Sequence, residues 1–243
     1  MKKYLSNLFI RIAFIIILIL FFDFLLDLTV GPLDNFIAKI FNIEFGFKGI
    51  LKKILMIIFS VTVMILIPGY NFKDFGFRAP KKLNYFKIIW LTFLVTIGSI
   101  IIFSVLYQGI LQSILGSTGK APAAATGEGK SFLSIVFGIW ILSSVSEEIE
   151  VRGLYQTLLK KLQNYKFLKL TLSVWLSGLI FGLLHISVYE AGNLAFTLQI
   201  MSSATALGLL AAYYREKSKS IYIPILVHML ANIYSSLLML ISQ

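Results

Sequence analysis

Long apolar runs separated by short polar segments dominate this sequence. Seven of these runs are close to the ~20 residues that an α-helix needs to cross a bilayer. They cover approximately residues 8–30, 53–70, 86–108, 132–158, 168–189, 192–213 and 220–241. No small-residue cleavage site follows the first run, so we expect it to be a helix and not a signal peptide. The pattern predicts an all-α fold, a polytopic membrane helix bundle of about seven transmembrane helices.

Two polar linkers interrupt the apolar pattern. Residues 71–84 are basic and aromatic, which is typical of a loop at the lipid headgroups, and residues 117–131 are small and polar, as in a solvated loop. We therefore expect two parts. Residues 1–131 would supply three spans and an outer loop, and residues 132–243 a core of four spans.

Composition supports a membrane protein. The 243 residues are 58% hydrophobic and only 14% charged, more apolar surface than a soluble domain of this length can bury. The net charge of +11 is compatible with nucleic-acid binding, but the cations fall between apolar runs, which predicts contact with anionic lipids and no nucleic acid. The absence of cysteine excludes disulfides, thiol nucleophiles and cysteine-ligated zinc.

The distribution of positive charge predicts an orientation. Most of the 22 basic residues lie in segments that would share a side with the N-terminus. The positive-inside rule then predicts a multi-pass protein of the cell membrane with a cytoplasmic N-terminus. Lys52 and Lys53 fit poorly, because they would lie at an outer boundary.

One motif argues for a nucleotide site, and its context argues against it. Residues 124–131, AATGEGKS, fit a relaxed phosphate-loop pattern. A phosphate loop needs a preceding buried strand in an α/β domain, whereas membrane helices flank this one. We expect no nucleotide cofactor, and we interpret Ser131 as the N-cap of the fourth span.

Four charges lie within the fourth apolar run, in the stretch SEEIEVRG at residues 146–153. An ionised residue at mid-bilayer costs about 2.5–3.5 kcal/mol, so such residues normally face a bundle interior. On an α-helix, Glu148 and Arg152 share a face and can pair, while Glu147 points to another sector. Glu150 points to neither, and we expect it to face water.

Both histidines of the chain lie in later apolar runs. Phe181 and His185 are four residues apart, as are His228 and Asn232, so each pair shares a helix face. His185 would lie toward the outer side and His228 nearer the inside. The two histidines can therefore meet only if the fifth helix is short, tilted or starts late.

Together these helices offer the groups that hydrolysis requires. Glu147 could take a proton from water while an imidazole orients it and another donor stabilises an oxyanion. A glutamate and the histidines could equally bind a divalent metal such as zinc, which would lower the pKa of its bound water. The residues alone leave both chemistries open.

Three spaced motifs resemble one known family. They are Glu147-Glu148-x-x-x-Arg152, Phe181-x-x-x-His185 and His228-x-x-x-Asn232. In this order on successive membrane helices, they are similar to the CPBP family, the CAAX protease and bacteriocin-processing proteins, also called Abi. The resemblance covers about residues 132–235.

The resemblance implies a role for each motif residue. Glu147 would be the catalytic glutamate, with Glu148 held by Arg152 beside it. His185 would join Glu147 in activating water. The two residues of the last motif, His228 and Asn232, would contact the oxyanion.

The resemblance leaves the role of a metal open. Members are usually labelled metalloproteases, with Glu147, His185 and His228 as the matching ligands here. A metal-free glutamate mechanism has also been proposed for the branch that acts on prenylated proteins.

Our leading hypothesis is an intramembrane endopeptidase that hydrolyses a hydrophobic or lipid-modified peptide. The alternative is a non-catalytic membrane protein for bacteriocin self-immunity or scaffolding. A transporter with a proton relay is a third class, but the inverted repeats typical of transporters are not visible. The sequence does not indicate the cleavage site or the oligomeric state.

Overall fold

The structure is a computed structural model, and it describes residues 8–41, 48–111, 113, 132–186 and 194–241. The long apolar runs form helices, because a backbone in lipid must satisfy its hydrogen bonds within its own segment. The helices outside the middle of the chain are α1 (Leu8–Phe41), α2 (Lys48–Leu66), α3 (Tyr85–Phe103) with its continuation η2 (Ser104–Leu111), α8 (Leu172–Leu183), α9 (Leu194–Ser218) and α10 (Tyr222–Ile241). The predicted all-α bundle is confirmed.

One continuous helix occupies the middle of the chain, and we call it the central helix. Its successive segments are η3 (Ser134–Ser143), α6 (Ser144–Glu148), η4 (Ile149–Tyr155), α7 (Gln156–Leu158) and η5 (Leu159–Asn164). The turns of η3 and η4 are π-helical, with i→i+5 spacing, whereas α6 and α7 are α-helical. Wider π turns often occur at functional sites.

Several helices are suited to a bilayer. Four are long and apolar enough to cross it, at Leu8–Ile37, Gly49–Leu66, Tyr85–Leu111 and Leu194–Ser218, and two shorter apolar helices cover Leu172–Ile186 and Tyr222–Leu238. Apolar side chains such as Ile17 and Trp90 are exposed on the outer surface. The chain is a multi-pass membrane protein, although the described helices do not confirm the count of seven spans.

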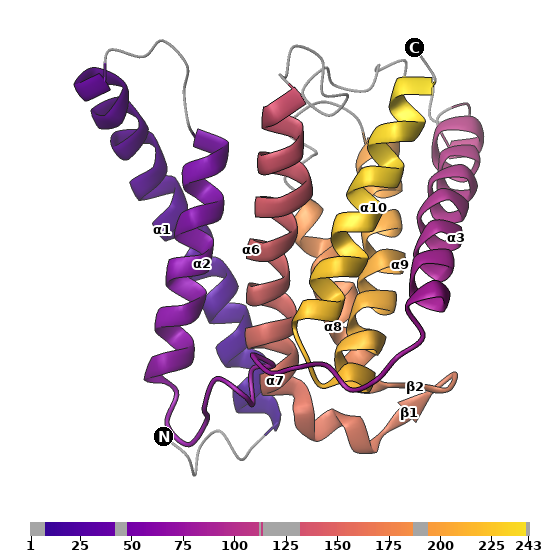
Figure 1. Cartoon of the computed structure of the whole chain (residues 1–243), viewed down its shortest axis with the longest axis horizontal. Coiled ribbons are helices and arrows are strands. Elements are labelled where there is room, and N and C mark those ends of the chain that lie inside the picture. Colours follow the sequence, from indigo (N-terminus) through magenta and orange to yellow (C-terminus); the bar gives the residue numbers. More distant parts are fainter. Residues whose placement is uncertain (1–7, 42–47, 112, 114–131, 187–193, 242–243) are drawn as a thin grey trace.

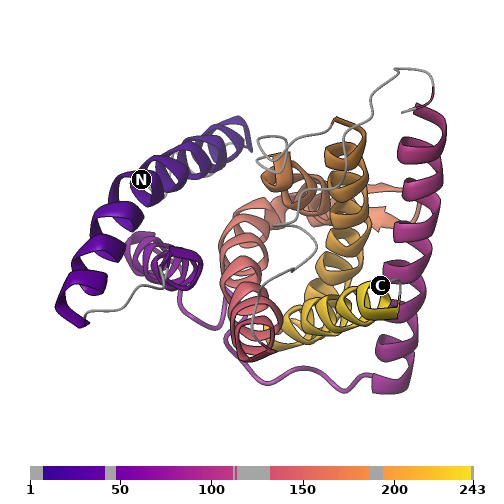
Figure 2. The same ribbon diagram turned by 90° about the horizontal axis from the view of Figure 1, so that it is seen from above.

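The central helix separates two groups of helices (Figures 1 and 2). On one side α1 packs against α2, and α2 contacts the central helix. On the other side α8, α9, α10 and α3 pack together, with α9 in contact with each of the other three. The central helix is therefore in contact with both groups.

Three of the described connections lie at the same end of the bundle (Figure 1). They are the segment 67–84, the short hairpin of β1 (Lys166–Phe167) and β2 (Leu170–Thr171), and the turn between α9 and α10. Asn84 caps α3 by accepting a hydrogen bond from the Lys87 N–H, and Thr171 caps α8 in the same way. The predicted loop at 71–84 is confirmed, the segment 114–131 lies outside the described residues, and the side of the membrane stays a prediction.

Helices α8 and α9 meet through glycine backbone. A Cβ at Gly182 would overlap the Thr205 hydroxyl, and one at Gly178 would lie 2.7 Å from Leu209 Cδ2. Small residues at such contacts let two membrane helices approach closely. The close approach sets α9, with its Gly208 carbonyl, near the buried part of the central helix.

Candidate active site

Glu148 and Arg152 form a fully buried ion pair on the central helix. Arg152 Nε lies 3.2 Å from Glu148 Oε2, and neither side chain is exposed. Arg152 Nη2 also donates to the Gly208 carbonyl at 2.9 Å, and its guanidinium lies 4.4 Å from the centre of the Phe181 ring. The pair expected from the four-residue spacing is confirmed, and α9 and α8 supply its surroundings.

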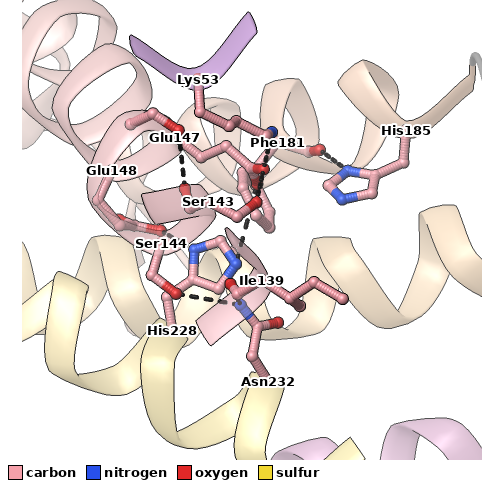
Figure 3. Close-up of polar contacts among 12 residues, drawn as sticks. Lys53, Ile139, Ser143, Ser144, Glu147, Glu148, Phe181, His185, His228 and Asn232 are labelled. Atoms are coloured by element: carbon pink, nitrogen blue, oxygen red, sulfur yellow. Dashed lines mark hydrogen bonds and ion pairs between the residues drawn. The ribbon is translucent and has the colours of Figure 1, made fainter. Parts of the chain in front are cut away.

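His228 lies between the two glutamates. Its Nδ1 is 3.0 Å from Glu148 Oε1, and its Nε2 is 3.8 Å from Glu147 Oε2. The Nδ1 hydrogen bond favours the tautomer that carries its proton on Nδ1, because a carboxylate only accepts. The other ring nitrogen is then turned toward Glu147 (Figure 3).

Glu147 has partners that the sequence did not predict. Lys53 Nζ from α2 lies 2.5 Å from Glu147 Oε1, and the Ser143 hydroxyl donates to the same oxygen at 2.5 Å. The carboxylate thus meets a cation, a hydroxyl and the His228 ring (Figure 3). From the sequence Lys53 fits only poorly, at an outer boundary, and it is the packing of α2 on the central helix that places it here.

Asn232 joins α10 to the central helix. Its Nδ2 donates to the Ile139 carbonyl and to the Ser144 hydroxyl, both at 3.0 Å. Ser144 is a further residue of this site that the sequence did not predict. The predicted contact of Asn232 with an oxyanion stays a prediction.

The two histidines approach each other because α8 is short. The Phe181 ring lies 5.0 Å from the His185 ring and 5.3 Å from the His228 ring, between centroids, with both rings at steep angles to it. His185 Nδ1 is 2.8 Å from the Phe181 carbonyl oxygen. The sequence allowed this approach only if the fifth helix is short, tilted or starts late. Helix α8 is short and starts late, at Leu172. His185 and Glu147 make no hydrogen bond to each other among the described contacts, but both line one cavity.

The expectation that Glu150 faces water is wrong. Its side chain is only 4% exposed, and Glu150 Oε1 accepts a hydrogen bond from the Tyr155 hydroxyl at 2.6 Å. The cause is the π-helical turn of η4, which brings residues five apart onto one face. Reasoning with α-helical spacing assigned Glu150 no partner.

The Glu150 contact gives a prediction on stability. Replacing Tyr155 with Phe removes the hydroxyl and leaves a buried carboxylate without its donor, so we expect unfolding free energy to fall by about 1–3 kcal/mol. Reversible unfolding in mixed micelles would measure the change. Tyr222→Phe is the matched control, because Tyr222 is 51% exposed and should change stability by less than about 0.5 kcal/mol. Equal effects of the two variants would contradict this account.

Two cavities adjoin the site from opposite sides of Phe181 and His185. One of about 180 Å³ lies toward α1 and α2 and is lined by Lys53, Glu147 and Glu150. The other, of about 260 Å³, lies among α3, α9 and α10 and is lined by His228, Asn232 and mainly apolar neighbours. The first is suited to water, and the second to an apolar group.

The residues as arranged do not fit a metal ion. Within the described part of the chain, no group of three His, Asp or Glu side chains meets the geometry of a metal site. Lys53 already neutralises the Glu147 oxygen on which a cation would bind. The His228 ring contacts Glu148 through Nδ1, which leaves only Nε2 on the side of Glu147.

A buried carboxylate and a carboxylate-bound imidazole beside two cavities are groups that general acid–base chemistry uses. Residues 129–234 match the family model described as Type II CAAX prenyl endopeptidase Rce1-like. The match confirms the resemblance to the CPBP family over this segment of the chain. Neither curated proteins nor solved structures gave a match.

Proposed function

We propose that this protein is an intramembrane endopeptidase that cleaves a hydrophobic or lipid-modified peptide. The observation that carries the proposal is the position of Glu147. Its carboxylate lines the cavity suited to water and lies 3.8 Å from the imidazole that lines the apolar cavity. The match of residues 129–234 to a prenyl endopeptidase family supports the same reaction class.

In the proposed reaction, Glu147 is the general base. It takes a proton from a water molecule, the resulting hydroxide attacks the peptide carbonyl carbon, and the carbonyl oxygen becomes an oxyanion. The proton then passes to the leaving nitrogen as the C–N bond breaks. His228 orients the reacting groups, and the Glu148–Arg152 pair positions His228 through its Nδ1 contact. His185 and Asn232 lie at the edge of this group of residues, where a bound substrate would complete their contacts.

Lys53 supports a mechanism without a metal, in which it positions the Glu147 carboxylate. Its Nζ lies 2.5 Å from Glu147 Oε1 and compensates the negative charge that a metal ion would otherwise compensate. A divalent metal on Glu147, His185 and His228 is the competing proposal, and it requires Lys53 to withdraw.

The metal question has a direct test. We expect purified protein to contain no stoichiometric zinc and to keep its activity in a chelator. Replacing Lys53 with Met should lower the rate by about tenfold, because a charge-assisted contact on the base is lost. Lys53→Arg should retain more activity than Lys53→Met. Stoichiometric zinc in the wild type that disappears in Glu147→Gln would instead support the metal mechanism.

The apolar cavity supports a substrate that carries an apolar group, such as a lipid chain, beside the scissile bond. It is lined by residues such as Phe181, Phe196 and Leu207, at the side of the site where His228 lies. Burial of apolar area stabilises a complex by about 25 cal/mol per Å², so a lipid chain would contribute strongly to binding.

The test uses the full chain in lipid nanodiscs and two peptides of identical sequence. One ends in a farnesylated Cys-a-a-X motif and the other carries an unmodified thiol. Mass spectrometry should detect cleavage of the farnesylated peptide at least about tenfold faster. Equal cleavage would assign the substrate to hydrophobic peptides in general. Cleavage of neither peptide, nor of an unmodified hydrophobic peptide, would favour a non-catalytic role.

A further inference from the structure

A polar cavity of about 310 Å³ lies at the end of the bundle where the loops gather. None of Glu147, His185, His228 and Asn232 lines it. Its lining residues come from the 71–84 loop, the central helix and the end of α9 with the following turn. Six of them are basic: Arg78, Lys81, Arg152, Lys160, Arg215 and Lys219. The cavity therefore lies apart from these four residues, shares Arg152 with the proposed site, and is strongly positive.

The two acidic residues of this cavity do not neutralise it. The carboxylate of Asp74 accepts a hydrogen bond from the Asn71 N–H at 3.0 Å, and that of Glu216 accepts one from the Thr171 hydroxyl at 2.7 Å. Among the described residues, no ion pair joins either carboxylate to a basic residue of the cavity. Apart from Arg152, which pairs with Glu148, the cations of the cavity consequently face one another without an ion pair among the described residues.

Arg215 is a buried and hydrogen-bonded part of the cavity wall, unlike a mobile charge on the surface. It is only 8% exposed, and its Nη2 donates to the Asp74 carbonyl at 3.1 Å. Gly76, with φ of +98°, leaves room for it, since a Cβ there would lie 2.7 Å from Arg215 Cζ. Its Nε has no hydrogen-bond partner among the described residues, nor has Arg152 Nη1. Buried donors left unpaired are costly, so both are candidates for an absent acceptor.

Lys219 is also affected by the neighbouring cations of the cavity. Partial burial lowers its pKa, Glu216 opposes this, and the charges of Arg215, Lys81 and Lys160 lower the pKa further. Lys219 lies beyond the end of α9, with φ of +60°, a backbone conformation unusual for a residue other than glycine. A bound anion would relieve the repulsion among these cations.

We propose that this cavity binds a phosphate group, carried by the headgroup of an anionic lipid or free in solution. Guanidinium groups match the geometry of phosphate oxygens and form charge-assisted hydrogen bonds with them. The cavity lies where the bundle ends and the basic loop begins, the level at which lipid headgroups meet a membrane protein. The proposal does not depend on the peptidase activity.

The experiment measures binding to the full chain in nanodiscs of zwitterionic lipid. Inorganic phosphate is titrated in one arm, and phosphatidic acid is included in the nanodiscs in the other. Thermal stability and native mass spectrometry report occupancy. Stabilisation by phosphatidic acid alone assigns a lipid headgroup, and stabilisation by inorganic phosphate assigns free phosphate. Stabilisation by neither overturns the proposal.

Two adjacent lysines provide the matched control. Lys81 lines the cavity and Lys82 does not, although both are exposed. Lys81→Ala should weaken binding by about tenfold and Lys82→Ala should leave it unchanged. Arg215→Lys keeps the positive charge but loses the planar guanidinium group with its paired donors, so it should also weaken binding. Equal losses in Lys81→Ala and Lys82→Ala would indicate general attraction to a basic surface and overturn the proposal.

A last pair of measurements separates this site from the proposed peptidase. Glu147→Gln should bind phosphate as the wild type does, because Glu147 does not line the cavity. Binding of a peptide with a free C-terminal carboxylate, but not of its amide or of phosphate, would assign the cavity to a carboxylate and contradict the proposal.

Discussion

Glu147→Gln is expected to lower the rate of peptide cleavage by about 10²–10⁴-fold, the contribution typical of a general base. Glutamine has nearly the same shape and can still accept hydrogen bonds from Lys53 and Ser143, so the surroundings should keep their arrangement. The amide cannot take a proton from water. Cleavage of the best peptide substrate in nanodiscs, measured by mass spectrometry, gives the rate.

The matched control for this variant is Glu150→Gln. Glu150 lies on the same helix three residues away and lines the same cavity, but its carboxylate contacts Tyr155 and not His228. We expect this variant to keep most of the activity. A full rate for Glu147→Gln, or equal losses for both variants, would refute the role of Glu147 as the base.

Arg152→Met should be the most destabilising single change at the site. It leaves Glu148 buried without its cation, and breaking a buried ion pair in this way costs about 3–5 kcal/mol. The guanidinium also donates to the Gly208 carbonyl and lies over the Phe181 ring, so its loss disturbs α8 and α9 as well. Unfolding in mixed micelles would measure the change.

A double variant separates charge from packing in this prediction. Adding Glu148→Gln to Arg152→Met removes the uncompensated charge, so part of the lost stability should return. If the double variant is less stable than Arg152→Met alone, the buried charge is not the cause of the destabilisation.

The four-residue spacing of side chains along a helix was sufficient to predict part of the site. The Glu148–Arg152 pair follows from four-residue periodicity, and the apolar runs were sufficient to predict the helices. The match over residues 129–234 confirms the resemblance drawn from the three motifs. These features depend on residues close in sequence, for which helix geometry determines the neighbours.

Other features depend on geometry that spacing does not encode. Lys53 reaches Glu147 across 94 positions of sequence, through helix packing. Glu150 finds Tyr155 through a π turn, which leaves no clear mark in the residues.

The start of the fifth helix was predicted too early for a similar reason. Leu168 and Lys169 both adopt positive φ in the two-residue turn of the hairpin, a conformation usually indicated by Asn or Gly. Neither residue type occurs in that turn, so the sequence indicated a continuous helix. The turn delays α8 and brings His185 to the depth of the site.

The glycine contact between α8 and α9 has a mechanical consequence. Helices that touch through backbone cannot slide or separate without losing their closest contacts, so α8 and α9 behave as one rigid body. That body carries Phe181, His185 and the Gly208 carbonyl. We therefore expect movement that admits a substrate to occur elsewhere, for example between α2 and the central helix. A crosslink between α8 and α9 should leave turnover unchanged, whereas one that ties α2 to the central helix should slow it.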